Sequence, residues 1–227
     1  MTTEDLKAEY ITFTAATLDG VAAFISPFVD NMIQHPVILR RVQREIDLAQ
    51  ARGELSYPVA TYDETTNLPY FMACIMETLR RDAPAQTILP RVISKGGLWY
   101  DGAFIPEGSE MGASPYIIHR DVHIFGDEPF AFRPERWLEG TARSALMEKY
   151  GMWWGYGGRE CVGKNYAVIE MQKLCLELCR RFDMRSAGAL QGDKGEGSLE
   201  KGDRYRHDRW AVGMFWGQGI IFSERSC

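Results

Sequence analysis

The sequence lacks the cysteine and histidine spacings on which most small metal sites depend. Its five cysteines contain no CxxC pair, and its four histidines do not cluster with the cysteines. A zinc site is therefore not expected. The number of cysteines is odd, and their spacings do not match a disulfide framework. A reducing compartment is therefore the default expectation.

The chain also lacks a basic excess, a long apolar run and a secretory leader. Its 227 residues carry a formal net charge of −5, which gives no reason to expect a nucleic-acid partner. No run approaches the roughly 18 apolar residues that span a bilayer, and the first ten residues, MTTEDLKAEY, are acidic and polar. We therefore expect no transmembrane segment in this chain and a cytoplasmic location for it.

The hydrophobic pattern predicts a mainly helical chain with a small sheet. A long helix is expected over residues 4–34, buried on more than one side and kinked at Pro27, with His35-Pro36 ending it. Further helices are expected over residues 37–53, from Leu68-Pro69 onward, and over residues 165–182.

The remaining segments carry turn and strand signals. Residues 86–118 alternate β-branched runs with Gly and Pro, which predicts a small sheet with hairpins. Residues 56–69 and 120–152 are expected to be irregular, residues 186–209 to form a polar mobile loop, and residues 210–222 to be strand-like. We find no internal repeat and no second core with its own boundary.

The stretch WWGYGGRECVGKN, residues 153–165, allows two kinds of ligand. Residues 158–164 fit the GxxxxGK part of a phosphate-binding loop, but Asn165 stands where that loop needs Ser or Thr to hold magnesium. The residues before it are aromatic rather than a buried strand. A P-loop-like NTPase is therefore the disfavoured interpretation.

The alternative is a thiolate that binds a metal. Cys161 lies just before Lys164, where a helix should begin, and the positive end of that helix would stabilise the anionic sulfur. Glycines allow a flat ligand to approach closely, and Arg159 could pair with a carboxylate of that ligand. A buried structural cysteine in a Gly-rich turn remains the simpler alternative for an isolated motif.

The pattern Trp154-x-x-Gly157-x-Arg159-x-Cys161-x-Gly163 resembles the cysteine loop of the cytochrome P-450 haem-thiolate monooxygenases, which usually begins with Phe. The resemblance implies that Cys161 is the axial ligand of the haem iron and that Arg159 pairs with a haem carboxylate. It also implies that Trp154 shields the sulfur and that Gly157 and Gly163 shape the loop.

Two further segments carry the same resemblance. Glu77 and Arg80 form an ExxR pair on one predicted helix face, which alone would be an exposed ion pair worth under about 1 kcal/mol. Residues 132–137, FRPERW, are similar to the family's aromatic-x-Pro-Glu-Arg-aromatic segment. The resemblance implies that Glu77, Arg80 and Arg136 form a structural charge lock behind the haem.

Other site residues follow only from the resemblance. Arg91 and His119 match positions that serve the haem carboxylates or face the haem edge, where a solvated Arg and a surface His are the simpler alternatives. Asp19 matches the acid of the family's proton-delivery pattern, but Gly20 stands where that pattern has Thr. We expect that Thr17, a substrate hydroxyl or an ordered water compensates, or that activity is weak.

The resemblance covers only the C-terminal half of the family's fold: the long central helix, the ExxR helix, the cysteine loop, the following helix and a terminal hairpin. Residues 1–227 are therefore expected to form one partial cytochrome P-450 domain, without the N-terminal half and membrane anchor. A full-length member would lie at the cytosolic face of the endoplasmic reticulum membrane. The partial chain should expose a large apolar surface, dissolve poorly and retain haem weakly.

The implied function is insertion of one oxygen atom from dioxygen into a small organic substrate. The implied cofactor is haem b, with electrons from NADPH through a reductase partner. The tail most resembles filamentous-fungal members, which suggests secondary metabolism. An inactive haem-binding or interaction remnant is the alternative.

Overall fold

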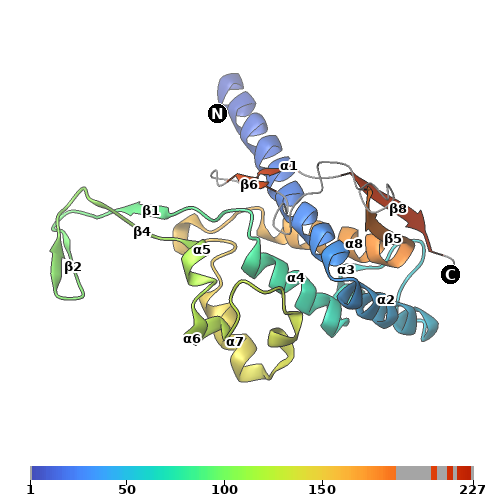
Figure 1. Cartoon of the computed structure of the whole chain (residues 1–227). Helices are drawn as coiled ribbons and strands as arrows, with labels where there is room; N and C mark the ends of the chain where they lie inside the picture. Colours follow the sequence, from blue (N-terminus) through green and yellow to red (C-terminus); the bar gives the residue numbers. More distant parts are fainter. Residues whose placement is uncertain (1, 188–205, 209–213, 217–218, 226–227) are drawn as a thin grey trace, which may run out of the picture.

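The computed structural model of the chain describes residues 2–187, 206–208, 214–216 and 219–225. Helices make up most of the structure, and the strands pair into small antiparallel two-stranded sheets (Figure 1). This confirms the predicted fold class. The polar loop predicted over residues 186–209 falls largely outside the described residues.

The first two helices end and begin where the sequence predicts. Helix α1 (Thr3–Gln34) starts with a capping box between Thr2 and Asp5 and continues through Pro27. Helix α2 (Pro36–Ala51) follows at once, because Pro36 is well suited to a first helical position and cannot donate within α1. Past its end, Gly53 adopts the positive φ of 71° that favours glycine.

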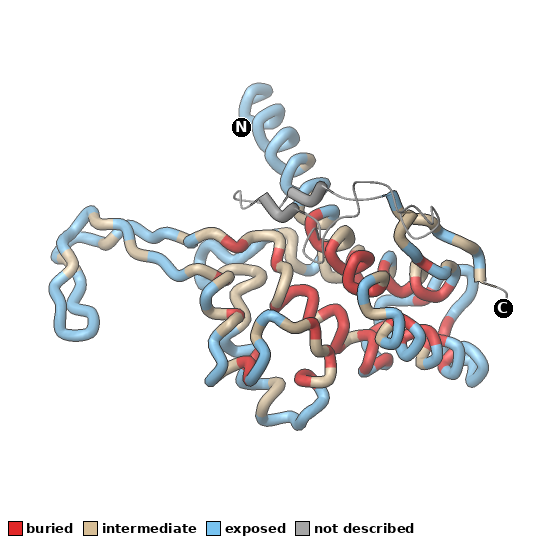
Figure 2. The backbone as a smooth tube through the Cα atoms, in the orientation of Figure 1, coloured by how far each residue is buried: buried red, intermediate tan, exposed pale blue. Residues whose placement is uncertain are grey.

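Helix α1 has two halves in different surroundings. From Ala23 onward it is largely buried, whereas its N-terminal half projects from the body and exposes several large apolar side chains: Leu6, Tyr10, Ile11, Phe13 and Leu18 (Figure 2). The prediction of burial on more than one side therefore holds only for the C-terminal half. The expected exposure of apolar surface is present.

The length and composition of α1 also bear on the membrane prediction. Within the described residues, helix α1 is long enough and apolar enough to cross a bilayer. The core helix of a soluble protein can meet the same criteria of length and composition. The expectation that no segment could span a membrane is corrected to that extent.

Residues 56–69, predicted as a loop, contain the short helix α3 (Tyr62–Thr66). Its capping box joins Thr61 and Glu64, a T-x-x-E pattern that can be recognised in the sequence. Helix α4 (Pro69–Arg81) then begins at the predicted proline and carries the ExxR pair.

Residues 86–118 form the predicted hairpins. Strand β1 (Leu89–Val92) pairs with β4 (Glu110–Ala113), and between them β2 (Leu98–Tyr100) pairs with β3 (Ala103–Ile105). Asp101 and Gly102 both have positive φ, as a two-residue hairpin turn requires. This nested hairpin extends away from the helices (Figure 1).

The segment predicted to be irregular, residues 120–152, is partly helical. The short helices that lie in or just before it are α5 (Pro115–Ile118), α6 (Val122–Phe125), η1 (Pro134–Leu138) and α7 (Thr141–Tyr150). The chain then passes through η2 (Gly157–Arg159) into the predicted long helix, α8 (Lys164–Arg181).

The strands after α8 agree with the expected terminal hairpin within the described residues. Strand β5 (Phe182–Ser186) pairs with β8 (Ile220–Glu224), and β6 (Arg206–Asp208) pairs with β7 (Met214–Trp216).

The main core lies where the buried half of α1 meets α2, α4 and α8. A smaller cluster gathers Ala73 of α4 with side chains from α6, η1 and α7. Met76 and Trp153 pack against both clusters. Trp153, the first residue of the WWGYGGRECVGKN stretch, is thus anchored to the interior on the side of α4.

Candidate functional site

Glu77 lies at the centre of a buried network of charged groups. Its two carboxylate oxygens accept hydrogen bonds from the guanidinium of Arg80 at 2.8 and 2.7 Å and from Arg136 Nε at 3.0 Å. The indole N–H of Trp137 and the backbone N–H of Arg133 donate to the same carboxylate at 3.0 and 2.9 Å. Since Glu77, Arg80 and Arg136 all have zero exposure, this is no surface ion pair.

The two arginines use their remaining donors on backbone carbonyls. Arg80 donates to the carbonyls of His119, Pro129 and Ala131 at 3.0, 2.7 and 3.0 Å. Arg136 donates to the carbonyls of Phe125, Asp127 and Glu128. A buried charge is tolerated only when it is paired and hydrogen-bonded. The network therefore fixes the backbone of residues 119–131 against α4, as a structural lock would.

Glu135, next to Arg136, points the opposite way and ties η1 to α2 and α4. Its Oε1 accepts from Arg41 Nη1 at 2.9 Å and from the Tyr70 hydroxyl at 2.8 Å. Close by, the backbone N–H groups of Tyr70 and Phe71 donate to Glu45. Burial, followed by the hydrogen bond to Glu135, raises the pKa of Tyr70 above its usual range.

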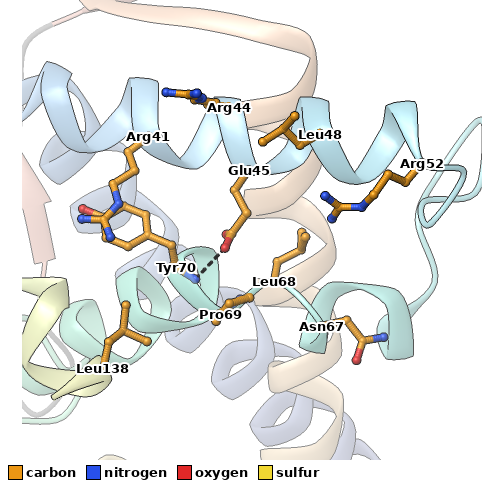
Figure 3. A pocket seen from close by; sticks show the side chains of 10 residues that line it. All are labelled: Arg41, Arg44, Glu45, Leu48, Arg52, Asn67, Leu68, Pro69, Tyr70 and Leu138. Atoms are coloured by element: carbon orange, nitrogen blue, oxygen red, sulfur yellow. Dashed lines mark hydrogen bonds between the residues drawn. The ribbon is translucent and has the colours of Figure 1, made fainter. Parts of the chain in front are cut away.

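Arg41, Glu45 and Tyr70 form part of the wall of an open groove of about 590 Å³ between α2 and the start of α4 (Figure 3). The groove is lined by Arg41, Arg44, Glu45, Leu48, Arg52, Asn67, Leu68, Pro69, Tyr70 and Leu138. None of its lining residues belongs to the cysteine loop. The groove and the cysteine loop are therefore separate features of the surface.

The loop of residues 153–163 presents one thiol at the start of a long helix. Cys161 is exposed, and its backbone N–H donates to the carbonyl of Trp154 at 2.8 Å. Gly163 is the N-cap of α8, and no side chain caps that helix. The positive end of the α8 dipole therefore begins close to Cys161, and the backbone N–H of Lys164, the first residue of α8, donates to the carbonyl of Cys161 at 3.3 Å.

The glycines keep the flank of the loop open. A Cβ added to Gly163 would lie 3.9 Å from Cys161 Sγ, whereas one added to Gly157 or Gly158 would meet nothing within 4 Å. Gly157 also has a φ of 64°, which a side chain would strain. A flat ligand can therefore approach this face of the loop.

The other described cysteines are of a different kind. Cys74, Cys175 and Cys179 are buried, and burial raises the pKa of each thiol, that of Cys179 to about 12. Cys161 is thus the one exposed thiol among the cysteines whose side chains the structure describes.

Two of the predicted cations lie at or near the loop. Arg159 is exposed within it. Arg91 of β1 is also exposed, and its Nη2 lies 3.5 Å from the carbonyl of Tyr156 in the cysteine loop, although 65 residues separate them. The structure thus brings Arg91 next to the loop, as a shared ligand would require.

The structure does not place His119 on an open edge. Its ring has zero exposure and contacts the rings of Phe125 and Trp153 with centroids 5.7 and 5.3 Å away. Its Nε2 accepts a hydrogen bond from the backbone N–H of Met152 at 2.9 Å. Burial, and then the positive charge of Arg80, lower the pKa of His119 to about 3. We expected His119 to face the edge of the haem. In the structure its ring is instead enclosed by protein and packs against Phe125 and Trp153.

The proton-delivery candidates lie on the outer part of α1. Asp19 is exposed, and a Cβ added to Gly20 would meet nothing within 4 Å. The Thr17 hydroxyl donates to the carbonyl of Phe13 at 2.9 Å, one turn back in the same helix. Thr17 is therefore already engaged by its own backbone.

The donor set decides which ligand the loop can hold. Among the described residues no three His, Cys, Asp or Glu side chains gather as a metal site. A single exposed thiol, open glycines and two nearby arginines instead suit a metal whose other ligands come from a flat, carboxylate-bearing macrocycle. The residues present therefore fit haem.

The phosphate-loop alternative does not fit this context. A P-loop connects a buried strand to a helix. Here helix α7 precedes the loop, and no described strand leads into it. The NTPase interpretation is therefore wrong, because the described residues lack the strand that a P-loop must follow.

Comparison with known proteins gives the family. Residues 1–196 match the family model of cytochrome P450. A cytochrome P450 monooxygenase of Aspergillus flavus is 36% identical over 166 residues, which is 73% of this chain and 32% of that protein. One of Alternaria alternata is 32% identical over 187 residues, 82% of this chain and 50% of that protein. The chain belongs to the cytochrome P450 family.

The likeness is to fungal members, as the sequence indicated. A pisatin demethylase of Fusarium vanettenii is 33% identical over 166 residues, 73% of this chain and 31% of the relative. The matched part of the chain therefore spans 31% to 50% of the length of these three relatives.

Proposed function

We propose that the chain is the thiolate-bearing part of a haem-thiolate monooxygenase, which inserts one oxygen atom from dioxygen into a small organic substrate. The observation that carries the proposal is the exposed Cys161 thiol beside the uncapped N-terminus of α8. The family membership supports the same reaction class.

Six residues would hold haem b. Cys161 would ligate the iron, and Arg159 and Arg91 would pair with the carboxylates. The aromatic ring of Trp154 and the open backbone at Gly157 and Gly163 would shield the sulfur and admit the ring. A haem with a thiolate ligand supplies oxygen activation, since the ligand pushes electron density toward the iron and favours O–O cleavage.

The Glu77 network would serve this site from behind. It makes no contact with Cys161 itself; Arg80 and Arg136 fix the backbone of residues 119–131, and Trp137 packs on Trp153 with ring centroids 6.0 Å apart. Trp153 begins the cysteine loop. The role we propose for Glu77, Arg80 and Arg136 is to hold the scaffold of the loop.

Asp19 would take part in proton delivery, and Gly20 weakens that function. The family pattern places a hydroxyl where Gly20 stands, and the Thr17 hydroxyl is bound to its own helix. A substrate hydroxyl or an ordered water would have to supply the missing group.

The variants Gly20→Thr and Gly20→Val form a matched pair, because they differ only in a hydroxyl and both fit the open space at this position. We expect Gly20→Thr to couple reductant consumption to product more tightly than Gly20→Val. Equal coupling would argue against a proton-delivery defect.

The proposed partners follow from the reaction. Electrons would come from NADPH through a reductase, and the substrate would be a small organic molecule, with a role in secondary metabolism suggested by the fungal relatives. Full-length members would act at the cytosolic face of the endoplasmic reticulum membrane.

Reconstitution with haem tests the ligand. After reduction and addition of carbon monoxide, a thiolate ligand gives a strongly red-shifted Soret band. We expect the band in the wild-type chain and in Cys227→Ala, which removes the cysteine at the C-terminus, and its loss in Cys161→Ala. Retention of the band in Cys161→Ala would overturn the assignment.

A second candidate is an inactive haem-binding or interaction remnant. Gly20, which lacks the hydroxyl of the family's proton-delivery pattern, favours it. A normal carbon monoxide spectrum with no substrate oxidation in the presence of a fungal NADPH reductase would support the remnant over the enzyme.

A further inference from the structure

His119 connects the buried charge network to the start of the cysteine loop. Its carbonyl oxygen accepts from Arg80 Nη1 at 3.0 Å, and its Nε2 accepts from the backbone N–H of Met152 at 2.9 Å. Met152 and Trp153 lead directly into the loop that carries Cys161. A chain of hydrogen bonds thus runs from Glu77 through Arg80 and His119 to the backbone that enters the loop.

The geometry fixes the protonation of the ring. A backbone N–H can only donate, so Nε2 of His119 must be unprotonated, and the proton of the neutral ring resides on Nδ1. Burial and the positive charges of Arg80 and Arg120 keep the ring neutral. Nδ1 is buried and has no partner among the described residues. Within the described residues, the His119 ring therefore leaves Nδ1 without a hydrogen bond, while its Nε2 accepts one from the backbone N–H of Met152.

Packing leaves this acceptor no freedom to move. Phe125 meets the His119 ring edge-on and Trp153 lies against it at a tilt of 44°. The ring itself has zero exposure. Water cannot easily reach the place of the fully buried ring, so loss of this acceptor would leave the partly buried Met152 N–H without its hydrogen-bond partner.

We propose that His119 is a positioning residue for the cysteine loop: through its Nε2 acceptor it fixes the backbone at Met152, and so sets where Cys161 stands for iron ligation. The ligation part of this proposal rests on the proposed function. The positioning part does not, because it concerns a backbone hydrogen bond present without haem.

A matched pair of variants tests the reach of the acceptor. The side-chain oxygen of His119→Gln extends about as far as Nε2, whereas that of His119→Asn extends only as far as Nδ1. Hydrogen exchange of the Met152 amide is measured in the full haem-free chain. We expect Gln to keep most of the protection, and Asn to speed exchange by at least about tenfold, since about 1.4 kcal/mol corresponds to that factor.

Exchange of α2 amides over residues 39–46 reports whether each variant remains folded, and His123→Gln, an exposed histidine nearby, should match the wild type. If Gln and Asn exchange equally fast at Met152 while α2 is protected, the positioning role is overturned. If Asn fails to fold, Gln with wild-type protection supports the proposal, and Gln with unprotected Met152 refutes it.

The haem-loaded chain gives the second measurement. We expect His119→Asn to shift a larger fraction of the ferrous carbon monoxide complex from the red-shifted thiolate band to an unshifted band than His119→Gln does. A wild-type chain without the red-shifted band would overturn the proposed function and leave the exchange result intact. A normal band in all variants would overturn the link from His119 to ligation.

Discussion

Trp137 donates its indole N–H to Oε2 of Glu77 over 3.0 Å, although 60 residues separate them in the chain. The bond makes the buried lock a four-residue arrangement, in which one carboxylate pairs with two arginines and also accepts a hydrogen bond from an indole. The same ring packs on Phe125 and Trp153. Trp137 thus contacts both the Glu77 carboxylate and Trp153, the residue at which the cysteine loop begins.

The first prediction separates the hydrogen bond from the charge. Trp137→Phe keeps an aromatic ring but removes the donor, and should lower the free energy of unfolding by about 1–3 kcal/mol. Glu77→Gln leaves two buried arginines without a counter-charge and should cost about 3–5 kcal/mol. Urea unfolding followed by circular dichroism measures both.

The control for this series is Trp99→Phe, in the exposed hairpin, which should change stability by less than about 0.5 kcal/mol. A Glu77→Gln chain as stable as Trp99→Phe would show that the buried network contributes little.

The second prediction concerns thiol reactivity. In a Cys227→Ala background, a small alkylating reagent should label Cys161 rapidly, because that thiol is exposed. Cys74, Cys175 and Cys179 should react at least about a hundredfold more slowly, since burial both covers them and raises their pKa. Peptide mass spectrometry of timed samples measures the rates.

Bound haem should protect Cys161 from the same reagent, with the other thiols unaffected. Equal labelling of Cys161 with and without haem would speak against its role as the iron ligand.

The third prediction is a pH dependence from His119. Its pKa falls from 6.5 to about 3 on folding, so between these values the unfolded chain binds the extra proton. The folded state is therefore fully favoured above about pH 6.5 and loses stability as the pH falls toward 3. At pH 4.5 the loss due to this residue should be about 2–3 kcal/mol relative to pH 7.5.

The measurement is the difference in urea stability between the two pH values. His119→Gln cannot titrate and should lose less than the wild type by that amount, whereas His123→Gln should follow the wild type. Parallel losses in all three chains would mean that other groups account for the acid sensitivity.

The fourth prediction is self-association through the outer half of α1. Ile11 and Leu18 are seven residues apart, so they lie on one face of the helix, and both are more than 60% exposed. The double substitution Ile11→Glu with Leu18→Glu should shift the chain from large species toward a monomer in light scattering. Glu substitutions at the polar positions Thr12 and Thr14 add the same two negative charges and serve as the control, and an equal shift there would point to net charge instead.

The sequence predicted those parts of the structure in which residue types repeat at a fixed spacing. The helices that carry Glu77 and follow Cys161 have regular apolar positions, and the motifs around Arg136 fixed the partners of the lock. The six backbone carbonyls that Arg80 and Arg136 bind could not be predicted, because any residue can supply a carbonyl. The short helices were harder still, although the Thr61–Glu64 capping box was a readable signal for α3.

His119 shows why a motif position can mislead. The match to the family suggested a residue near the haem edge, and an isolated His in IIHRD carries no local sign of burial. Its surroundings come from Phe125 and Trp153, which are distant in sequence from one another. Only the packed structure distinguishes a ring that faces a ligand from one that holds the backbone behind it.

Helix α1, finally, belongs to two cooperative units. Its C-terminal half, from Ala23, is packed in the main core, so its amides should exchange only when the core opens. The N-terminal half is largely exposed and begins with its own capping box, and short helices with little packing are marginal in water. A single unbroken helix should therefore show a steep gradient of opening free energy along its length, near zero at Thr3 and close to the global value at Phe28.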